Sequence, residues 1–268
     1  MEFNSFFDPV PRVVAHRGDN ENYPENTLQS FLSAQKLGID IIETDVHLSK
    51  DNVVVIWHDN KLDRNTNGKG RIEDYNLSEL KKLDAGFSFT KDKGQTFPFR
   101  GKGITLCTLE EALIACPKER FNVDLKTKAP QMVKEFIKVI EKTNAQERVV
   151  CASFHLSNLK LTRELAPYIA TSVTTLEVLP LLLKQKLHLL SKRPFDKLVI
   201  FQLPYKIAKL PVVTKNFIKI MHQKGAIVMV WTINDAKSMK KLFSKGIDSI
   251  MSDKPSLLVE VAKELKIK

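Results

Sequence analysis

The chain has 268 residues, of which 43% are hydrophobic and 27% charged, and its formal net charge is +11. With only 10 glycines, 12 prolines and three cysteines, it cannot be a collagen-like repeat, a disordered tail or a disulfide scaffold. A chain of this length buries a large core without staples, and α/β barrels of roughly 200–250 residues fold as one domain.

The cysteines and the apolar segments indicate in which cellular compartment the protein resides. Three cysteines at positions 107, 116 and 151 are an odd number without metal-site spacing, and the first ten residues lack the basic and apolar regions of a signal peptide. The most apolar stretch, 176–190, contains Pro180, Lys184 and Lys186 and is shorter than the ~20 residues that span a bilayer. We therefore expect a cytoplasmic protein.

Charge differs between the two halves of the chain. Residues 1–125 hold 16 basic and 20 acidic residues, whereas residues 126–268 hold 26 basic and 11 acidic residues. A basic half suits nucleic acid, anionic lipid or an anionic substrate, and lysine-rich helix faces in water give the same count. We favour solvated faces, expect no nucleic-acid partner, and leave open a weak association with an anionic membrane surface.

Short apolar runs alternate with helical patterns along the whole chain. The runs and patterns follow one another as strand 13–16, helix 27–38, strands 40–48 and 53–59, helices 76–86 and 108–116, strand 121–126, helix 129–144, strand 149–154, helix 157–167, strand 168–174, helix 176–191, strand 197–203, helix 214–225, strand 226–233, helix 234–246, strand 248–253 and helix 255–268.

This alternation predicts a parallel sheet. Eight of the nine strands fit a closed (β/α)₈ TIM barrel formed by one domain over residues 1–268. Strand 53–59 follows its predecessor after four residues, too few for a parallel crossover, so we expect an excursion and a small insertion over about 53–103. A doubly wound open sheet is the competing fold, but no G-x-G-x-x-G follows the first strand.

Polar residues gather at the ends of these strands, where barrel enzymes hold their active sites. Strand 13–16 ends in His16 and Arg17, and strand 53–59 ends in His58 and Asp59. Period-2 alternation puts Glu43 and Asp45 on one face of their strand. The other strands contribute Asn122, Asp124, Lys126, Ser153 and Trp231.

Two buried carboxylates on one face repel each other unless a cation joins them. Together with Asp124 from another strand, Glu43 and Asp45 suit one divalent cation, Mg²⁺ or Ca²⁺. Ordinary salt bridges to lysines are the alternative. His16 and His58 suit general acid–base work near neutral pH. His47 has the parity of Glu43 and Asp45, so it is either a further ligand or lies just beyond the site.

Residues 15–70 carry a resemblance to a known family. H-R-G, P-E-N-T, I-E-x-D-V, H-D and L-x-R-x-T-x-G-x-G occur there in order, followed by L-D-A-G, T-L-E-E, V-D-L-K, A-S-F, W-T-I-N and S-D-K-P. The chain resembles the glycerophosphodiester phosphodiesterase family over nearly its whole length.

The resemblance implies a metal-dependent TIM-barrel hydrolase that releases sn-glycerol 3-phosphate and an alcohol from glycerophosphodiesters. It implies that His16 and His58 are the acid–base pair, and that segment 87–103 covers the glycerol end of the substrate. The metal ligands would be Glu43, Asp45 and Asp124, and the substrate contacts would be Arg17, Lys126 and Trp231.

The sequence departs from the family pattern at two places that touch the expected site. Asp124 stands where the family usually has Glu, which leaves the metal preference open. Phe87, Ser88 and Phe89 replace a small-Trp-Phe pattern near the glycerol end.

Two other functions remain as alternatives. One is a phospholipase D-like enzyme acting on lysophospholipid or sphingomyelin. The other is a non-catalytic barrel that binds an anionic partner. The alcohol on the diester, the nucleophile (water or the glycerol 2-hydroxyl) and the oligomeric state are not predicted.

Overall fold

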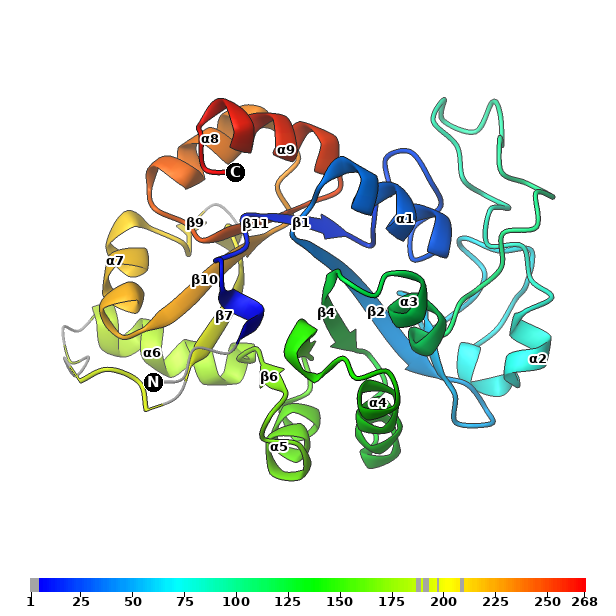
Figure 1. Cartoon of the computed structure of the whole chain (residues 1–268), viewed down its shortest axis with the longest axis horizontal. Coiled ribbons are helices and arrows are strands. Elements are labelled where there is room, and N and C mark those ends of the chain that lie inside the picture. Colours follow the sequence, from blue (N-terminus) through cyan, green and yellow to red (C-terminus); the bar gives the residue numbers. More distant parts are fainter. Residues whose placement is uncertain (1–4, 187–188, 190–192, 197, 208–209) are drawn as a thin grey trace.

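A computed structural model of the chain describes residues 5–186, 189, 193–196, 198–207 and 210–268. Eight parallel strands form a nearly closed barrel, surrounded by helices (Figure 1). Around the barrel the strand order is β6-β5-β4-β2-β1-β11-β10-β7. The strands are β1 (Val13–His16), β2 (Ile41–Leu48), β4 (Arg120–Leu125), β5 (Val149–Ala152), β6 (Ala170–Thr171), β7 (Val199–Pro204), β10 (Ala226–Trp231) and β11 (Ser249–Ser252).

The predicted TIM barrel is confirmed, with one difference at its seam. Among the residues that the structure describes, a bridge between Ser172 and Ile200 is the only link between β6 and β7, so the barrel is nearly closed there. The predicted strand 168–174 shrinks to two residues because the chain turns early into the next helix. At this turn the backbone N–H and hydroxyl of Thr174 donate to the carboxylate of Glu177.

The helices bury one face against the barrel, and two of them begin at threonine residues that cap them. Thr27 and Thr108 both form capping boxes, and Gly38 ends its helix in the left-handed conformation. The outer helices are α1 (Leu28–Leu37), α3 (Leu109–Ala115), α4 (Pro130–Lys142), α5 (Leu156–Leu165), α6 (Thr175–Lys186), α7 (Lys215–Gln223), α8 (Ala236–Ser244) and α9 (Pro255–Glu264). No helix in the described part of the chain is long and apolar enough to cross a membrane.

Apolar side chains fill the barrel interior from the N-terminal end of the strands. Val14, Ile41, Ile200 and Met229 are buried there in one cluster. This cluster includes Phe6 and Phe7 from the short 3₁₀ helix η1 (Ser5–Phe7), whose rings are almost fully buried. The interior is therefore packed at this end, and polar residues occupy the other.

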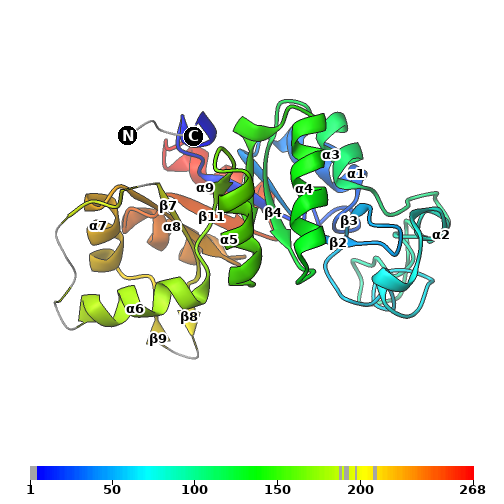
Figure 2. The same ribbon diagram turned by 90° about the horizontal axis from the view of Figure 1, so that it is seen from below.

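The predicted excursion is confirmed. β3 (Val54–Ile56) pairs antiparallel with β2, forms a further bridge from Val55 to Thr108, and takes no place in the barrel. The segment that follows has its own small core around Val55, Leu62 and Leu106. It contains η2 (Ile72–Asp74) and α2 (Leu77–Leu80) and projects from one side of the barrel (Figure 2).

One local expectation is wrong, and one pair of strands was not predicted. The predicted helix 76–86 has only the four residues of α2, because residues beyond it bond to a distant segment: Ala85 N–H donates to the carbonyl of Ile104, and Gly101 N–H donates to Asp84. A hairpin of β8 (Lys206–Ile207) and β9 (Leu210–Pro211) was not predicted. Two-residue strands carry no periodicity that a sequence can show.

Candidate active site

Parallel register brings the predicted residues to one mouth of the barrel. His16 pairs with Glu43 across β1 and β2, and Asp45 pairs with Asp124 across β2 and β4. A cavity of about 330 Å³ opens at this mouth. All eight predicted site residues line it: His16, Arg17, Glu43, Asp45, His58, Asp124, Lys126 and Trp231.

The three carboxylates of this cavity are all buried. Burial and the nearby charge of Asp45 raise the pKa of Glu43 to about 7. Burial also raises the pKa of Asp124, whose Oδ1 has no hydrogen-bond partner. Burial acts in the same direction on Asp45, but the charges of Lys126 and Arg17 outweigh it and lower the pKa of Asp45. Further positive charge would stabilise the first two carboxylates in their ionised form.

Two cations lie against the carboxylates. Lys126 Nζ is 2.9 Å from Asp45 Oδ1 and 2.6 Å from Asp124 Oδ2. Burial lowers the pKa of this ammonium, but the two carboxylates outweigh it and the net pKa is raised. Lys126 is therefore charged and holds two of the three acids.

Arg17 follows β1 in a left-handed conformation, with a φ of 59°, and Gly18 follows with a φ of 81°. This turn points the Arg17 backbone N–H at Glu43 Oε2, 3.1 Å away. Its guanidinium donates to Glu25 at 3.0 Å, and its Nε lies 3.4 Å from Asp45. A side chain at position 18 would contact Ser30, so the turn needs glycine.

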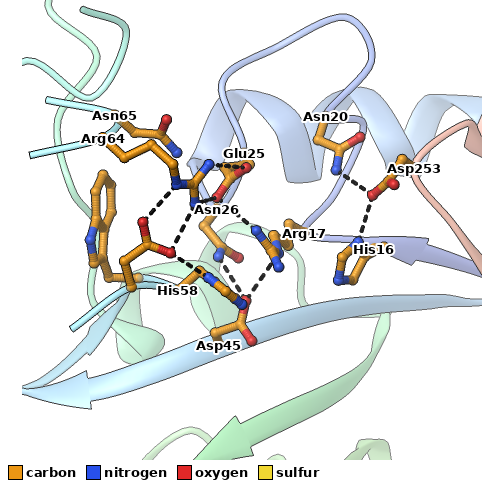
Figure 3. Close-up of polar contacts among 12 residues, drawn as sticks. His16, Arg17, Asn20, Glu25, Asn26, Asp45, His58, Arg64, Asn65 and Asp253 are labelled. Carbon is orange, nitrogen blue, oxygen red and sulfur yellow. Dashed lines mark hydrogen bonds and ion pairs between the residues drawn. The ribbon is translucent and has the colours of Figure 1, made fainter. Parts of the chain in front are cut away.

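Each predicted catalytic histidine bonds to a carboxylate through Nδ1 (Figure 3). His16 Nδ1 donates to Asp253 Oδ1 at 2.6 Å, and His58 Nδ1 donates to Asp59 Oδ1 at 2.6 Å. A carboxylate can only accept here, which assigns the proton to Nδ1 and leaves Nε2 of each ring for other partners. His16 Nε2 lies 3.8 Å from Glu43.

The first histidine, His16, is held by a carboxylate that other side chains fix in place. Burial lowers the pKa of His16, but the charge of Glu43 and the bond to Asp253 outweigh it, so the pKa is raised. Asp253 also accepts hydrogen bonds from Asn20 and Asn234. These contacts fix the carboxylate behind the His16 ring.

A chain of ion pairs fixes the second histidine. Asp59 accepts from Arg64 Nε at 2.6 Å, and the other end of the Arg64 guanidinium donates to Glu25, which also binds Arg17 (Figure 3). Burial raises the pKa of Asp59, but Arg64 and His58 outweigh it and bring that pKa to about 2. His58 is therefore linked to Arg17 through fixed charges.

Asn26 was not singled out in the sequence. Its amide donates to Asp45 Oδ2 at 3.0 Å, and its carbonyl oxygen accepts from Thr44. Asp253 was missed as well. Both residues lie in short motifs of the resemblance, P-E-N-T and S-D-K-P, and that was the only available signal. Neither residue has a period or spacing that points to the mouth of the barrel.

His47 is not among the residues that line the cavity. Its Nε2 donates to the backbone carbonyl of His58 at 3.1 Å, and burial lowers its pKa. His47 therefore supports the loop that carries His58 and lies just beyond the cavity.

A second cavity of about 360 Å³ adjoins the first, and His16 and Arg17 line both. Its other walls are mostly polar and come from the loop after β1, from the excursion and from the loop after β11. They are Asn20, Pro24, Glu25, Asn65, Ala85, Ser88, Phe89 and Asp253. Segment 87–103 thus contributes Ser88 and Phe89 to a polar chamber beside the histidines.

The carboxylates suit a cation by their chemistry more than by their present spacing. In the described residues, no three His, Cys, Asp or Glu side chains are drawn together as a formed metal cage. Lys126 joins two of the acids instead. The unpartnered Asp124 Oδ1 and the raised pKa of Glu43 both fit a hard divalent cation.

Two carboxylate-bound histidines and a cluster of acids and cations lie at the carboxyl ends of the strands, and this arrangement places the protein in the class of TIM-barrel enzymes. Comparison with known proteins narrows this class. Residues 16–257 match the model of the glycerophosphoryl diester phosphodiesterase family.

Individual relatives match nearly the whole length of the chain. The chain is 32% identical to a glycerophosphodiester phosphodiesterase of Bacillus altitudinis over 96% of this chain and 100% of the relative. It is 31% identical to one from Caldanaerobacter subterraneus subsp. tengcongensis over 94% of this chain and 98% of the relative. The chain belongs to the glycerophosphoryl diester phosphodiesterase family.

Solved structures of the family include a similar phosphodiesterase from Oleispira antarctica. That protein is 28% identical, with a TM-score of 0.77 over 96% of this chain and 98% of that chain. Its structure contains the product sn-glycerol 3-phosphate.

Proposed function

We propose that this protein hydrolyses glycerophosphodiesters to sn-glycerol 3-phosphate and an alcohol. The observation that carries the proposal is the junction of the two cavities, where His16 and Arg17 line both spaces beside the acidic cluster. Family membership and the product held by the Oleispira antarctica relative support it.

The polar chamber takes the glycerol in this proposal. Glycerol offers two hydroxyl groups next to the phosphate ester, and Asn20, Glu25, Asn65 and Ser88 offer donors and acceptors for them. The phosphate then lies at the junction, where Arg17 and Lys126 provide positive charge for its oxygens. Trp231 stands on the opposite wall of the first cavity.

A divalent cation, Mg²⁺ or Ca²⁺, completes the site in this proposal, held by Glu43, Asp45 and Asp124. The buried acidic cluster supports it, because Asp124 Oδ1 has no hydrogen-bond partner and the pKa of Glu43 is raised. When bound, the cation acts as a Lewis acid toward a phosphoryl oxygen. Lys126 must release at least one of its two carboxylates to make room, and its ammonium then faces the phosphate.

The histidines move the protons. Since Nδ1 of each ring is held by a carboxylate, Nε2 is the nitrogen that exchanges a proton with the substrate. One ring takes a proton from the nucleophile, which is water or the glycerol 2-hydroxyl, as the P–O bond to the alcohol breaks. The other ring gives its proton to the departing alkoxide. Each transfer contributes roughly 10²–10⁴-fold.

The test is release of sn-glycerol 3-phosphate from glycerophosphocholine, glycerophosphoethanolamine and glycerophosphoglycerol, with lysophosphatidylcholine as the phospholipase D-like alternative. Each reaction is run with Mg²⁺, with Ca²⁺ and with a chelator. We expect release that depends on the cation. Release unchanged by the chelator would remove the cation from the proposal, and no release from any diester would refute the proposed activity.

A further inference from the structure

The catalytic cavity has two chemically different sides. The charged groups that line it are the seven already described at the barrel mouth, all of them on the phosphate side. The other side has no charged group and is largely apolar: Val173, Val178, Leu179, Leu182, Val212 and Trp231 line it, together with uncharged polar residues such as Thr174 and Gln202. Its α6 residues come from the helix that covers the seam between β6 and β7.

This apolar side continues to the molecular surface. Leu179 lines the cavity and is also 52% exposed, and its neighbours on α6, Leu176 and Leu183, are 64% and 59% exposed. On the other rim, Phe154 is 61% exposed and packs edge-on against Trp231 at a centroid distance of 6.2 Å. Contiguous exposed apolar side chains at a cavity mouth are typical of a binding surface.

The polar chamber offers a contrast. It is lined by Glu25, Asp253 and two asparagine side chains, which suit hydroxyl groups and exclude a hydrocarbon chain. With glycerol in that chamber and the phosphate at the junction, the second ester oxygen of the phosphate faces the apolar side. The group attached to that oxygen is the alcohol that leaves.

We propose that the leaving alcohol carries an acyl or alkyl chain, and that the apolar side formed with α6 binds this hydrocarbon chain. This inference rests on the hydrolase activity proposed above. The substrate is then an amphiphilic glycerophosphodiester. In the overall reaction the oxygen of water joins the phosphorus, the P–O bond to the acylated alcohol breaks, and the alcohol departs with a proton. The products are sn-glycerol 3-phosphate and a chain-bearing alcohol.

Two substrates that differ only in the length of the acyl chain test its contribution to turnover. Glycerophospho-N-acetylethanolamine and glycerophospho-N-hexanoylethanolamine are both neutral amides on the alcohol side, break the same bond and differ by four methylene groups. Both are short enough to be studied as monomers in solution, which keeps micelles out of the comparison. We expect kcat/KM for sn-glycerol 3-phosphate release to be at least tenfold higher for the hexanoyl compound, because the apolar side buries the added methylenes.

A matched pair of variants tests whether the acyl chain of the substrate binds at the apolar side of the cavity. Leu179→Gln places a polar amide on the apolar side, and we expect it to lower the hexanoyl-to-acetyl ratio of kcat/KM at least threefold. Leu165→Gln is the control: Leu165 is 46% exposed at the end of α5 and is not part of the cavity. That variant keeps the ratio of the unmodified protein.

Each other outcome overturns the inference in a recognisable way. A hexanoyl-to-acetyl ratio near one, or equal ratios in the two variants, would leave the proposed hydrolase standing and remove the chain site. Faster turnover of glycerophosphocholine than of the hexanoyl compound would point instead to a quaternary ammonium against the rings of Phe154 and Trp231. Hydrolysis of none of these diesters would refute the proposed activity, and the chain site with it.

Discussion

Replacing Asp253 by Asn tests whether this carboxylate positions His16. The change keeps the size of the side chain and removes the negative charge that accepts the proton of His16 Nδ1 at 2.6 Å. An amide offers the ring a donor or a weaker acceptor, so the imidazole loses the partner that fixes its orientation and tautomer. His16 Nε2 then faces the substrate in the correct state for only part of the time.

The size of the effect follows from the bond. A hydrogen bond to a charged group contributes roughly 1.5–3 kcal/mol, and each 1.36 kcal/mol is about tenfold in rate. Because the Asp253 side chain is 36% exposed, solvent screens part of this energy. The lower part of the energy range therefore applies, and we expect kcat to fall about 10- to 30-fold with little change in KM.

The assay is steady-state release of sn-glycerol 3-phosphate, together with the shift in melting temperature that the divalent cation causes. Asp235→Asn is the matched control, because Asp235 caps α8 and lines neither cavity, and Asn caps a helix as well as Asp does. A kcat within twofold of the unmodified protein, or an equal loss in the control, would refute the positioning role of Asp253. Loss of the cation-induced shift would instead place the residue in cation binding.

Three further predictions follow from the site and its surroundings. His58→Ala removes one proton carrier and should lower kcat at least 100-fold while leaving the cation-induced melting shift in place; near-normal turnover would exclude His58 from the mechanism. Glu43→Gln should lose cation binding, measured by calorimetry, and activity together, and retention of tight binding would contradict its role as a ligand. Burial raises the pKa of the Cys107 and Cys151 thiols to about 12 and of Cys116 to about 11, so the neutral thiol is the native form. A thiol reagent at pH 8 should label none of the three in the folded protein and all three in denaturant, and fast labelling of the native protein would show that the described burial is wrong.

Several features of this protein follow from local patterns in the chain. Alternating apolar runs and helical periods required a parallel sheet with helices outside, and the four-residue gap before strand 53–59 required a hairpin, which β3 forms with β2. Strand parity was enough to put Glu43 and Asp45 on one face. Thr27 and Thr108 cap their helices through hydrogen bonds made within four residues, which is a local property of the chain.

Long-range contacts decided the rest. The hydrogen bond from His16 to Asp253 joins residues 237 positions apart, and the contact of Glu25 with Arg64 joins a loop after β1 to the excursion after β3. No periodicity reports such pairs, because they depend on which strands become neighbours when the barrel closes. In the closed barrel, one bridge joins the seam among the described residues, and leucines of α6 lie beside the charged cluster. Residue types and their faces are local properties of the chain, whereas the partners of each functional side chain, and the apolar character of one side of the cavity, arise only when distant segments meet.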